Sequence, residues 1–139
     1  MRIGHITGSA WLVNKAGTHV LLTHHKKLDM WLQLGGHADG NHDIIDAAHQ
    51  EAVEESGIEA LNVWNSEIFD IDIHLIPERG KEPAHLHYDV RFAYQVKGSE
   101  DYTVSEESHD LGWIEIASIG NLTSEESMMR MARKWTDCL

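Results

Sequence analysis

The sequence has little of several features that define specialised protein classes. One cysteine, Cys138, stands among 139 residues, which excludes an intrachain disulfide and a zinc site built from cysteines. The chain has only 2 prolines, and its composition is not that of a disordered or collagen-like protein. No apolar run approaches the roughly 20 residues that a membrane-spanning helix needs. Since the N-terminus also lacks the apolar core of a signal peptide, we expect a cytoplasmic protein with no membrane partner.

Basic residues are also scarce. Lys and Arg total 11 against 23 Asp and Glu, which gives a formal net charge of −12 with histidine neutral. Duplex nucleic acids are bound largely through Lys and Arg on their phosphates, so we expect no nucleic-acid duplex as a partner. A protein this acidic that handles phosphates needs metal cations to screen them. Histidine, in contrast, is abundant, with 11 copies.

The hydrophobic pattern predicts a mixture of strands with two helices. The expected strands are 6–13, 18–24, 60–65, 68–76, 84–96 and 111–116, with a short apolar piece at 30–34 that stops at Gly35. Apolar residues then recur at helical spacing and predict a helix over 43–56. Thr123 and Glu126 have the spacing of a capping box, which predicts a second helix. Length and pattern together predict one α/β domain over residues 1–139.

Two of the expected strands, 68–76 and 84–96, alternate so that one face of their hairpin is polar. That face would hold Asp70, Asp72, His74, His85, His87, Asp89 and Arg91. A symmetric register would place His74 near His87. Because arginine binds phosphate through two hydrogen bonds, Arg91, His85 and His87 are candidate substrate-binding residues. A solvent-exposed polar face is the alternative, and the spacing of the two histidines also allows them to chelate one metal ion.

Three glutamates mark the predicted helix 43–56. Glu51, Glu54 and Glu55 stand at i, i+3 and i+4 and so share one stripe of the helix. Like charges repel one another, and a bound divalent cation converts that repulsion into attraction. Oxygen ligands select hard ions such as Mg²⁺, Mn²⁺ or Ca²⁺. The stripe therefore predicts either a metal site or an exposed acidic face.

The context of these glutamates resembles the Nudix family, whose signature is G-x5-E-x7-R-E-U-x-E-E-x-G-U with U aliphatic. The signature begins at Gly36 and ends at Ile58, and Ala52 takes its first aliphatic position; the other matches are Glu51, Glu54, Glu55 and Gly57. Two positions depart, because His42 replaces the signature Glu and Gln50 the signature Arg. In the family those two residues form an ion pair, and a hydrogen bond between His42 and Gln50 could take its place.

The resemblance implies a Nudix-type α/β/α sandwich with a mixed β-sheet. It also implies a hydrolase that cleaves the diphosphate linkage of a nucleoside diphosphate derivative with Mg²⁺ or Mn²⁺. The implied metal ligands are Glu51, Glu54, Glu55 and the carbonyl of Gly36. The general base would be Glu54 or, on a polar acidic segment at 98–110, Glu106 or Glu107. His37 follows the glycine pair and becomes a candidate substrate contact. The resemblance is compatible with a homodimer, and a non-catalytic nucleotide-binding module is the alternative function.

Overall fold

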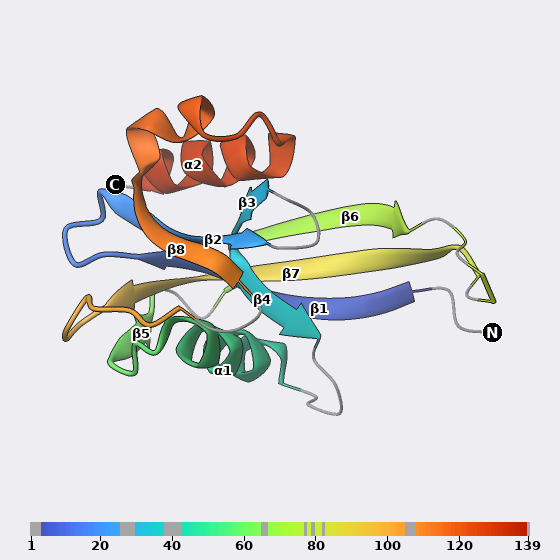
Figure 1. The fold of residues 1–139 in the computed structure, drawn as a ribbon, viewed down its shortest axis with the longest axis horizontal. Helices are drawn as coiled ribbons and strands as arrows, with labels where there is room; N and C mark the ends of the chain where they lie inside the picture. Colours follow the sequence, from blue (N-terminus) through green and yellow to red (C-terminus); the bar gives the residue numbers. More distant parts are fainter. Residues whose placement is uncertain are drawn as a thin grey trace.

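A mixed β-sheet carries one helix on each of its faces in the computed structural model (Figure 1). The structure describes residues 4–25, 30–37, 43–64, 67–76, 78, 80–81, 83–104 and 108–138. The helices are α1 (Ile44–Ser56), the 3₁₀ helix η1 (Ile116–Asn121) and α2 (Glu126–Cys138). The predicted α/β/α sandwich is therefore confirmed.

The central strand of the sheet is β1, which has neighbours on both edges. The strands are β1 (Gly4–Val13), β2 (His19–His25), β3 (Met30–Leu32), β4 (Leu34–His37), β5 (Leu61–Val63), β6 (Asp70–Ile76), β7 (His85–Val96) and β8 (Ser108–Glu115). Strand β1 runs parallel to β7 over its whole length and antiparallel to β4. The remaining pairs, β2 with β1, β3 and β8, and β7 with β5 and β6, are antiparallel.

Alternation along the strands divides the core into two layers. Under α1 lie Ala10, Leu12, Leu21, Leu34, Ala48, Ala52, Ile58, Leu61, Phe92, Tyr94, Val96 and Leu111. Under α2 lie Trp11, Val13, Val20, Leu22, Ala93, Ile116, Ile119, Met128, Met131, Ala132 and Trp135. Successive side chains of a strand point to opposite faces, so neighbours such as Trp11 and Leu12 enter different layers. The burial of both layers holds the helices against the sheet.

The segment 30–34 differs from its prediction as one short apolar piece ending at the glycines. The chain forms β3, which pairs with β2, and after Gln33 it changes partner to form β4, which pairs with β1. Strand β4 continues through the glycine pair to His37. A Cβ on Gly35 would lie 2.3 Å from Oγ of Ser9 and 2.8 Å from its Cα. Glycine is therefore required there by the close approach of β1, and it does not end the strand.

Helix α1 has the ends that its sequence predicts. The side chain of Asp43 accepts a hydrogen bond from the Asp46 N–H at 3.3 Å, which satisfies a donor of the first turn. Gly57 has a φ of 75° and its N–H donates to the carbonyl of Val53, the left-handed ending that favours glycine.

Helix α2 begins later than the predicted capping box requires. Thr123 does not cap it, because the Thr123 hydroxyl accepts from the Glu125 N–H at 3.1 Å. The carboxylate of Glu125 instead accepts from the Met128 N–H at 2.9 Å. The helix therefore starts at Glu126 with Glu125 as its cap, which corrects the prediction by two residues.

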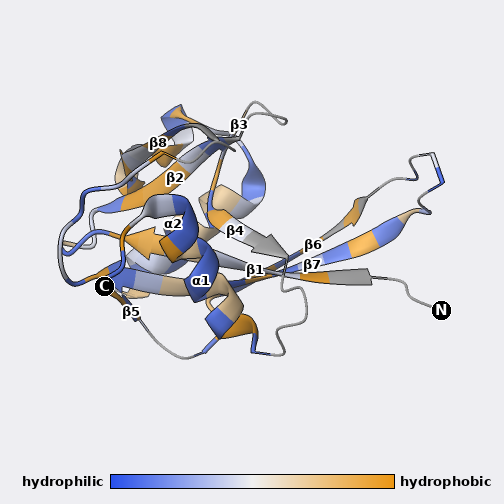
Figure 2. Ribbon diagram, turned by 60° about the horizontal axis from the view of Figure 1, so that its bottom comes forward, coloured by the Kyte–Doolittle hydropathy of each residue, from blue (hydrophilic) through white to orange (hydrophobic). Residues whose placement is uncertain are grey.

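Strands β1, β6 and β7 extend together past both helices (Figures 1 and 2). On the α1 side of this extension, Ile71, Ile73 and Leu75 are exposed. The opposite side carries the alternate polar residues of the same strands. None of the helices in the described part of the chain is long and apolar enough to span a membrane.

Candidate active site

The glutamate stripe of α1 faces the start of β4. Glu51 and Glu55 are half-buried, whereas Glu54 is exposed. The Gly35 N–H donates a hydrogen bond to Oε2 of Glu55 at 3.3 Å. This contact holds the carboxylate of Glu55 at the backbone of Gly35, which directly precedes the predicted ligand Gly36 in the sequence.

These donors fit a hard divalent cation in their chemistry, because carboxylate and carbonyl oxygens are its preferred ligands. The structure does not present a closed site: among the side chains it describes, no three of His, Cys, Asp or Glu lie close enough to hold one ion. Glu54 points to solvent from the same stripe. Glu106, Glu107 and His42 lie outside the described residues, and so does the predicted His42–Gln50 bond.

One side-chain hydrogen bond fixes α1 on the sheet beside this stripe. The Tyr94 hydroxyl donates to the carbonyl of Ile45 at 2.6 Å, and burial together with the nearby Asp46 and Asp43 carboxylates raises the pKa of Tyr94. The hydroxyl therefore stays protonated and remains a donor. Gln50 donates to Oδ2 of Asp46 at 3.3 Å within the helix. At the other end of α1, the Thr103 N–H donates to the Ser56 carbonyl at 2.8 Å.

Strand β4 also joins the glycine pair to the polar residues of the hairpin. His37 is paired with Thr7 of β1, Thr7 with Asp89 of β7, and Asp89 with Asp72 of β6. These four positions form one row across four strands. The predicted hairpin register is confirmed, since His74 pairs with His87 and Asp70 with Arg91. We call the side of β4, β1, β7 and β6 that carries this row the polar face.

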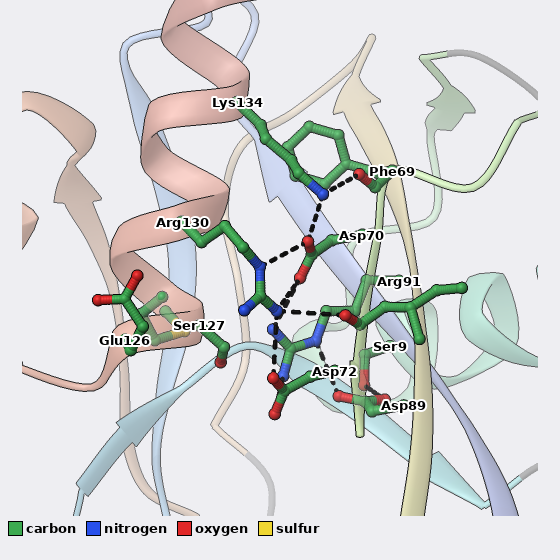
Figure 3. A network of polar contacts seen from close by, with 12 residues as sticks. Ser9, Phe69, Asp70, Asp72, Asp89, Arg91, Glu126, Ser127, Arg130 and Lys134 are labelled. Atoms are coloured by element: carbon green, nitrogen blue, oxygen red, sulfur yellow. Dashed lines mark hydrogen bonds and ion pairs between the residues drawn. The ribbon is translucent and has the colours of Figure 1, made fainter. Parts of the chain in front are cut away.

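The polar face contains a buried charge network (Figure 3). Asp70 and Arg91 are 2% and 3% exposed, and Nη1 of Arg91 donates to Oδ2 of Asp70 at 3.2 Å. Arg130 of α2 contacts both oxygens of Asp70, at 2.9 and 2.7 Å. Lys134, one turn later, also donates to Asp70. Arg91 is held from its other side by Oδ2 of Asp89 at 2.9 Å.

Asp89 extends this network back to the glycine pair. Its carboxylate accepts from Thr7 at 2.9 Å and from Ser9 at 2.6 Å. It also accepts from Nε2 of Gln33 at 3.1 Å, and Gln33 immediately precedes β4. The Oε1 of Gln33 is buried with no hydrogen-bond partner among the described residues. A continuous chain of contacts therefore runs from α2 through Asp70, Arg91 and Asp89 to the segment that carries Gly36.

The family to which this fold and site belong follows from comparison with known proteins. The NUDIX domain family matches residues 5–135. The chain belongs to the NUDIX domain family. Residues 36–58 lie inside the matched range, so the predicted Nudix signature and the fold around it are parts of one family domain.

Solved Nudix structures share the fold of the chain at low sequence identity. A crystal structure of a C. elegans Ap4A hydrolase binary complex has a TM-score of 0.76 and 20% identity and covers 96% of each chain. A Clostridium perfringens hydrolase of the NUDIX family has a TM-score of 0.67 and 25% identity, covering 96% of this chain and 97% of that one. E. coli dihydroneopterin triphosphate pyrophosphohydrolase has a TM-score of 0.74 and 14% identity, with the same coverage.

No curated protein matches the chain. The predicted family and the predicted fold are confirmed, and so is the assignment to the Nudix hydrolases, enzymes that act on phosphoanhydride bonds. Nudix hydrolases as a class generally depend on divalent metal ions. The residues named for metal, base and substrate stay predictions.

The candidate substrate residues of this Nudix domain all lie on the polar face or at its edge. His85 and His87 are half-buried, and His37 enters by its register with Thr7. Arg91 is enclosed by Asp70, Asp72 and Asp89, and this placement favours a role in holding the sheet together. The exposed-face alternative is wrong at Asp70, Asp89 and Arg91, because all three are buried.

Several residues of the network were not identified from the sequence. Arg130 and Lys134 are one turn apart on α2, a spacing that shows a shared helix face and does not reveal what the face covers. Gln33 lies in a segment whose change of strand partner was not predicted. The alternation of acids on residues 70–72 was visible in the sequence, but their partners on α2 are about 60 residues away.

The stability of this Nudix domain is expected to depend on pH through Asp70. Burial by itself raises the pKa of Asp70, but hydrogen bonds and charges from Arg130 and Lys134 outweigh it and hold the pKa below its usual value. A lowered folded pKa gives stability that is complete above the unfolded pKa of about 3.9 and is lost as the pH falls through the folded pKa. We therefore expect the melting temperature to fall below pH 4, and to fall less steeply in Asp70→Asn. The measurement is thermal unfolding of both proteins between pH 6 and pH 2.5. An equal fall of the melting temperature with pH in the two proteins would contradict this expectation.

Proposed function

We propose that this Nudix protein hydrolyses the diphosphate linkage of a nucleoside diphosphate derivative and uses Mg²⁺ or Mn²⁺. The observation that supports this most directly is the 3.3 Å hydrogen bond between Glu55 and the Gly35 N–H. It brings a carboxylate of the signature helix to the backbone of Gly35, the residue before the signature glycine Gly36. The solved relatives are named for different substrates, but each of these substrates contains phosphates linked to one another.

The residues that would hold the ion are Glu51, Glu55 and the carbonyl of Gly36, with Glu54 beside them. A bound divalent ion would neutralise phosphate charge and lower the pKa of water. Glu51 and Glu55 are half-buried, so their like charges are not fully screened by solvent. This favours the binding of a cation between the helix and β4 over a solvated acidic face.

The base that takes a proton from the attacking water is assigned to Glu54 or Glu107. Glu54 is exposed on the same stripe as the ligands, so a water molecule has access to it. Glu107 lies just after a segment whose Thr103 is hydrogen-bonded to the last turn of α1. Both carboxylates therefore stay candidates for the general base.

The substrate would lie against the polar face. His37 follows the glycine pair directly, and His85 and His87 belong to the next strand but one. Imidazoles can donate hydrogen bonds to phosphate oxygens. We place the protein in the cytoplasm, where such small nucleotides are found, and the homodimer stays a prediction.

Removal of divalent cations is expected to abolish hydrolysis. The experiment follows release of nucleoside monophosphate, phosphate and pyrophosphate from a panel of nucleoside triphosphates, sugar nucleotides, dinucleoside polyphosphates and coenzyme A. EDTA should eliminate turnover, and added Mg²⁺ or Mn²⁺ should restore it. The panel members that are cleaved would define the substrate class.

A non-catalytic nucleotide-binding module is the other function to be tested, because His42 and Gln50 depart from the signature. Binding of panel members without turnover under any metal condition would favour that module and reject the hydrolase. Turnover that persists in EDTA would reject the proposed metal dependence.

A further inference from the structure

The part of the sheet that extends past both helices has one apolar face (Figure 2). Directly paired residues on adjacent strands share a face, and so do alternate residues of one strand. By this rule the register of β1, β6 and β7 brings together seven large apolar side chains, which we call the apolar face: Ile6, Ile71, Ile73, Leu75, Leu86, Tyr88 and Val90. No charged residue interrupts these alternate positions.

The apolar face continues the core layer beneath α1 into solvent. Val90 packs against the buried residues of that layer. Further along β6, Ile73 and Leu75 are 56% and 61% exposed, and Ile6 of β1 is 52% exposed. A sheet normally buries its apolar face against a second layer. Among the described residues no helix or strand supplies that layer here, because α1 covers only the inner part of the sheet (Figure 1).

The size of the apolar face matches what a dimer interface needs. Its seven side chains expose roughly 500 Å² of apolar surface, at the upper end of the roughly 300–600 Å² that the largest patch of a typical monomer reaches. A standard interface buries about 800 Å² on each partner, and about 65% of a homodimer interface, or about 520 Å², is apolar. The apolar face can therefore supply the apolar share of an interface without help from other surfaces.

The distribution of charge favours a second copy of the chain over a membrane surface as the partner. The formal net charge of −12 opposes binding to anionic lipids. The charged residues Asp70, Asp72, Asp89 and Arg91 occupy the other positions of β6 and β7, on the opposite side of the sheet. Two copies that meet through the apolar face therefore keep these charged groups on the outer sides of the pair.

We propose that two copies of the chain associate by packing their apolar faces against each other. A twofold axis would use the same patch on both copies, so the interface has to be self-complementary. Two flat apolar sheet faces satisfy this by interdigitating their side chains at a spacing of about 10 Å. The helices lie at the other end of the sheet, which leaves the face accessible (Figure 1). This association is independent of the metal site and of the proposed hydrolysis.

The experiment measures the mass of the full chain by sedimentation velocity across the micromolar concentration range. We expect a species of twice 15.7 kDa that dissociates on dilution. Ile73 pairs with Tyr88 in the middle of the apolar face. Ile73→Asp would bury an unpaired carboxylate in the interface, so it should raise the dissociation constant by about 100-fold or more.

Ile68→Asp is the matched control. Ile68 is 52% exposed, close to Ile73, but it lies in a cavity with Trp64 and Phe69 and outside the apolar face. Its replacement introduces the same charge and should leave the dissociation constant unchanged. Equal association of Ile73→Asp and Ile68→Asp would overturn the proposal, and so would a wild-type chain that sediments as a monomer at every concentration.

Thermal unfolding monitors the fold of each variant. If Ile73→Asp is unfolded, Ile73→Thr keeps a β-branched side chain suited to a strand and should weaken association at least about tenfold; unchanged association there would overturn the proposal. A further arm mixes the wild-type chain with vesicles of phosphatidylserine and phosphatidylcholine. A monomer that sediments with these vesicles would assign the apolar face to a membrane and reject the dimer.

Discussion

Replacement of Glu55 by Gln is expected to lower metal-dependent hydrolysis by at least about 100-fold. The amide oxygen of Gln can still accept the Gly35 N–H that Glu55 accepts at 3.3 Å, so the junction of α1 and β4 should survive. The substitution removes one negative charge from the ligand set. A metal ion contributes several kcal/mol to transition-state stabilisation, and a loss of about 2.7 kcal/mol corresponds to 100-fold in rate. The measurement is kcat/KM on the best substrate of the panel across a Mg²⁺ titration.

Glu59→Gln is the matched control for this variant. Glu59 is an exposed glutamate that follows α1 and lies off its stripe, so its neutralisation should leave kcat/KM within about twofold. Activity in Glu55→Gln close to that of Glu59→Gln would show that Glu55 does not hold the ion. Recovery at high Mg²⁺ would indicate that the loss is one of metal affinity, in agreement with the assigned role.

Asp70→Asn is expected to destabilise the folded chain by about 3–5 kcal/mol, the cost of breaking a buried ion pair from one side. Asp70 accepts from Arg91, Arg130 and Lys134. The amide nitrogen of Asn would face these donors with further N–H groups. Arg91 is 3% exposed and cannot recover its hydration in place. Urea unfolding at pH 7 measures the loss, and the m-value shows whether the unfolded state has changed.

Glu126→Gln is the matched control, because it neutralises an exposed carboxylate of α2. Glu126 pairs with Arg133 at 2.8 Å, and both side chains are more than half exposed. Exposed pairs contribute little, so we expect a change within about 0.5 kcal/mol. If Asp70→Asn lowers the free energy of unfolding no more than Glu126→Gln does, solvent replaces the lost contacts of Asp70. The charge network then does not hold α2 to the hairpin.

The sequence by itself determined the parts of this Nudix protein that depend on local pattern. Glycine and capping residues fixed both ends of α1, and the spacing of three glutamates placed them on one stripe. Strict alternation in residues 68–76 and 84–96 determined which side chains share a face of the hairpin, whereas the register itself was only assumed to be symmetric. A shift by one residue would exchange the two faces, whereas a shift by two would keep them, so alternation alone leaves the register open. These features are encoded within a few residues of where they act.

The tertiary structure alone decided which of these faces meet. Strand β1 pairs in parallel with β7, about 80 residues away, and this pairing sets His5 beside His87. The partner change between β3 and β4 brings Gln33 to Asp89, and the docking of α2 supplies Arg130 to Asp70. Periodicity shows which side of an element is polar or apolar, but not which distant segment covers it. Those choices depend on how the whole chain packs its two core layers, so they could be read only from the folded molecule.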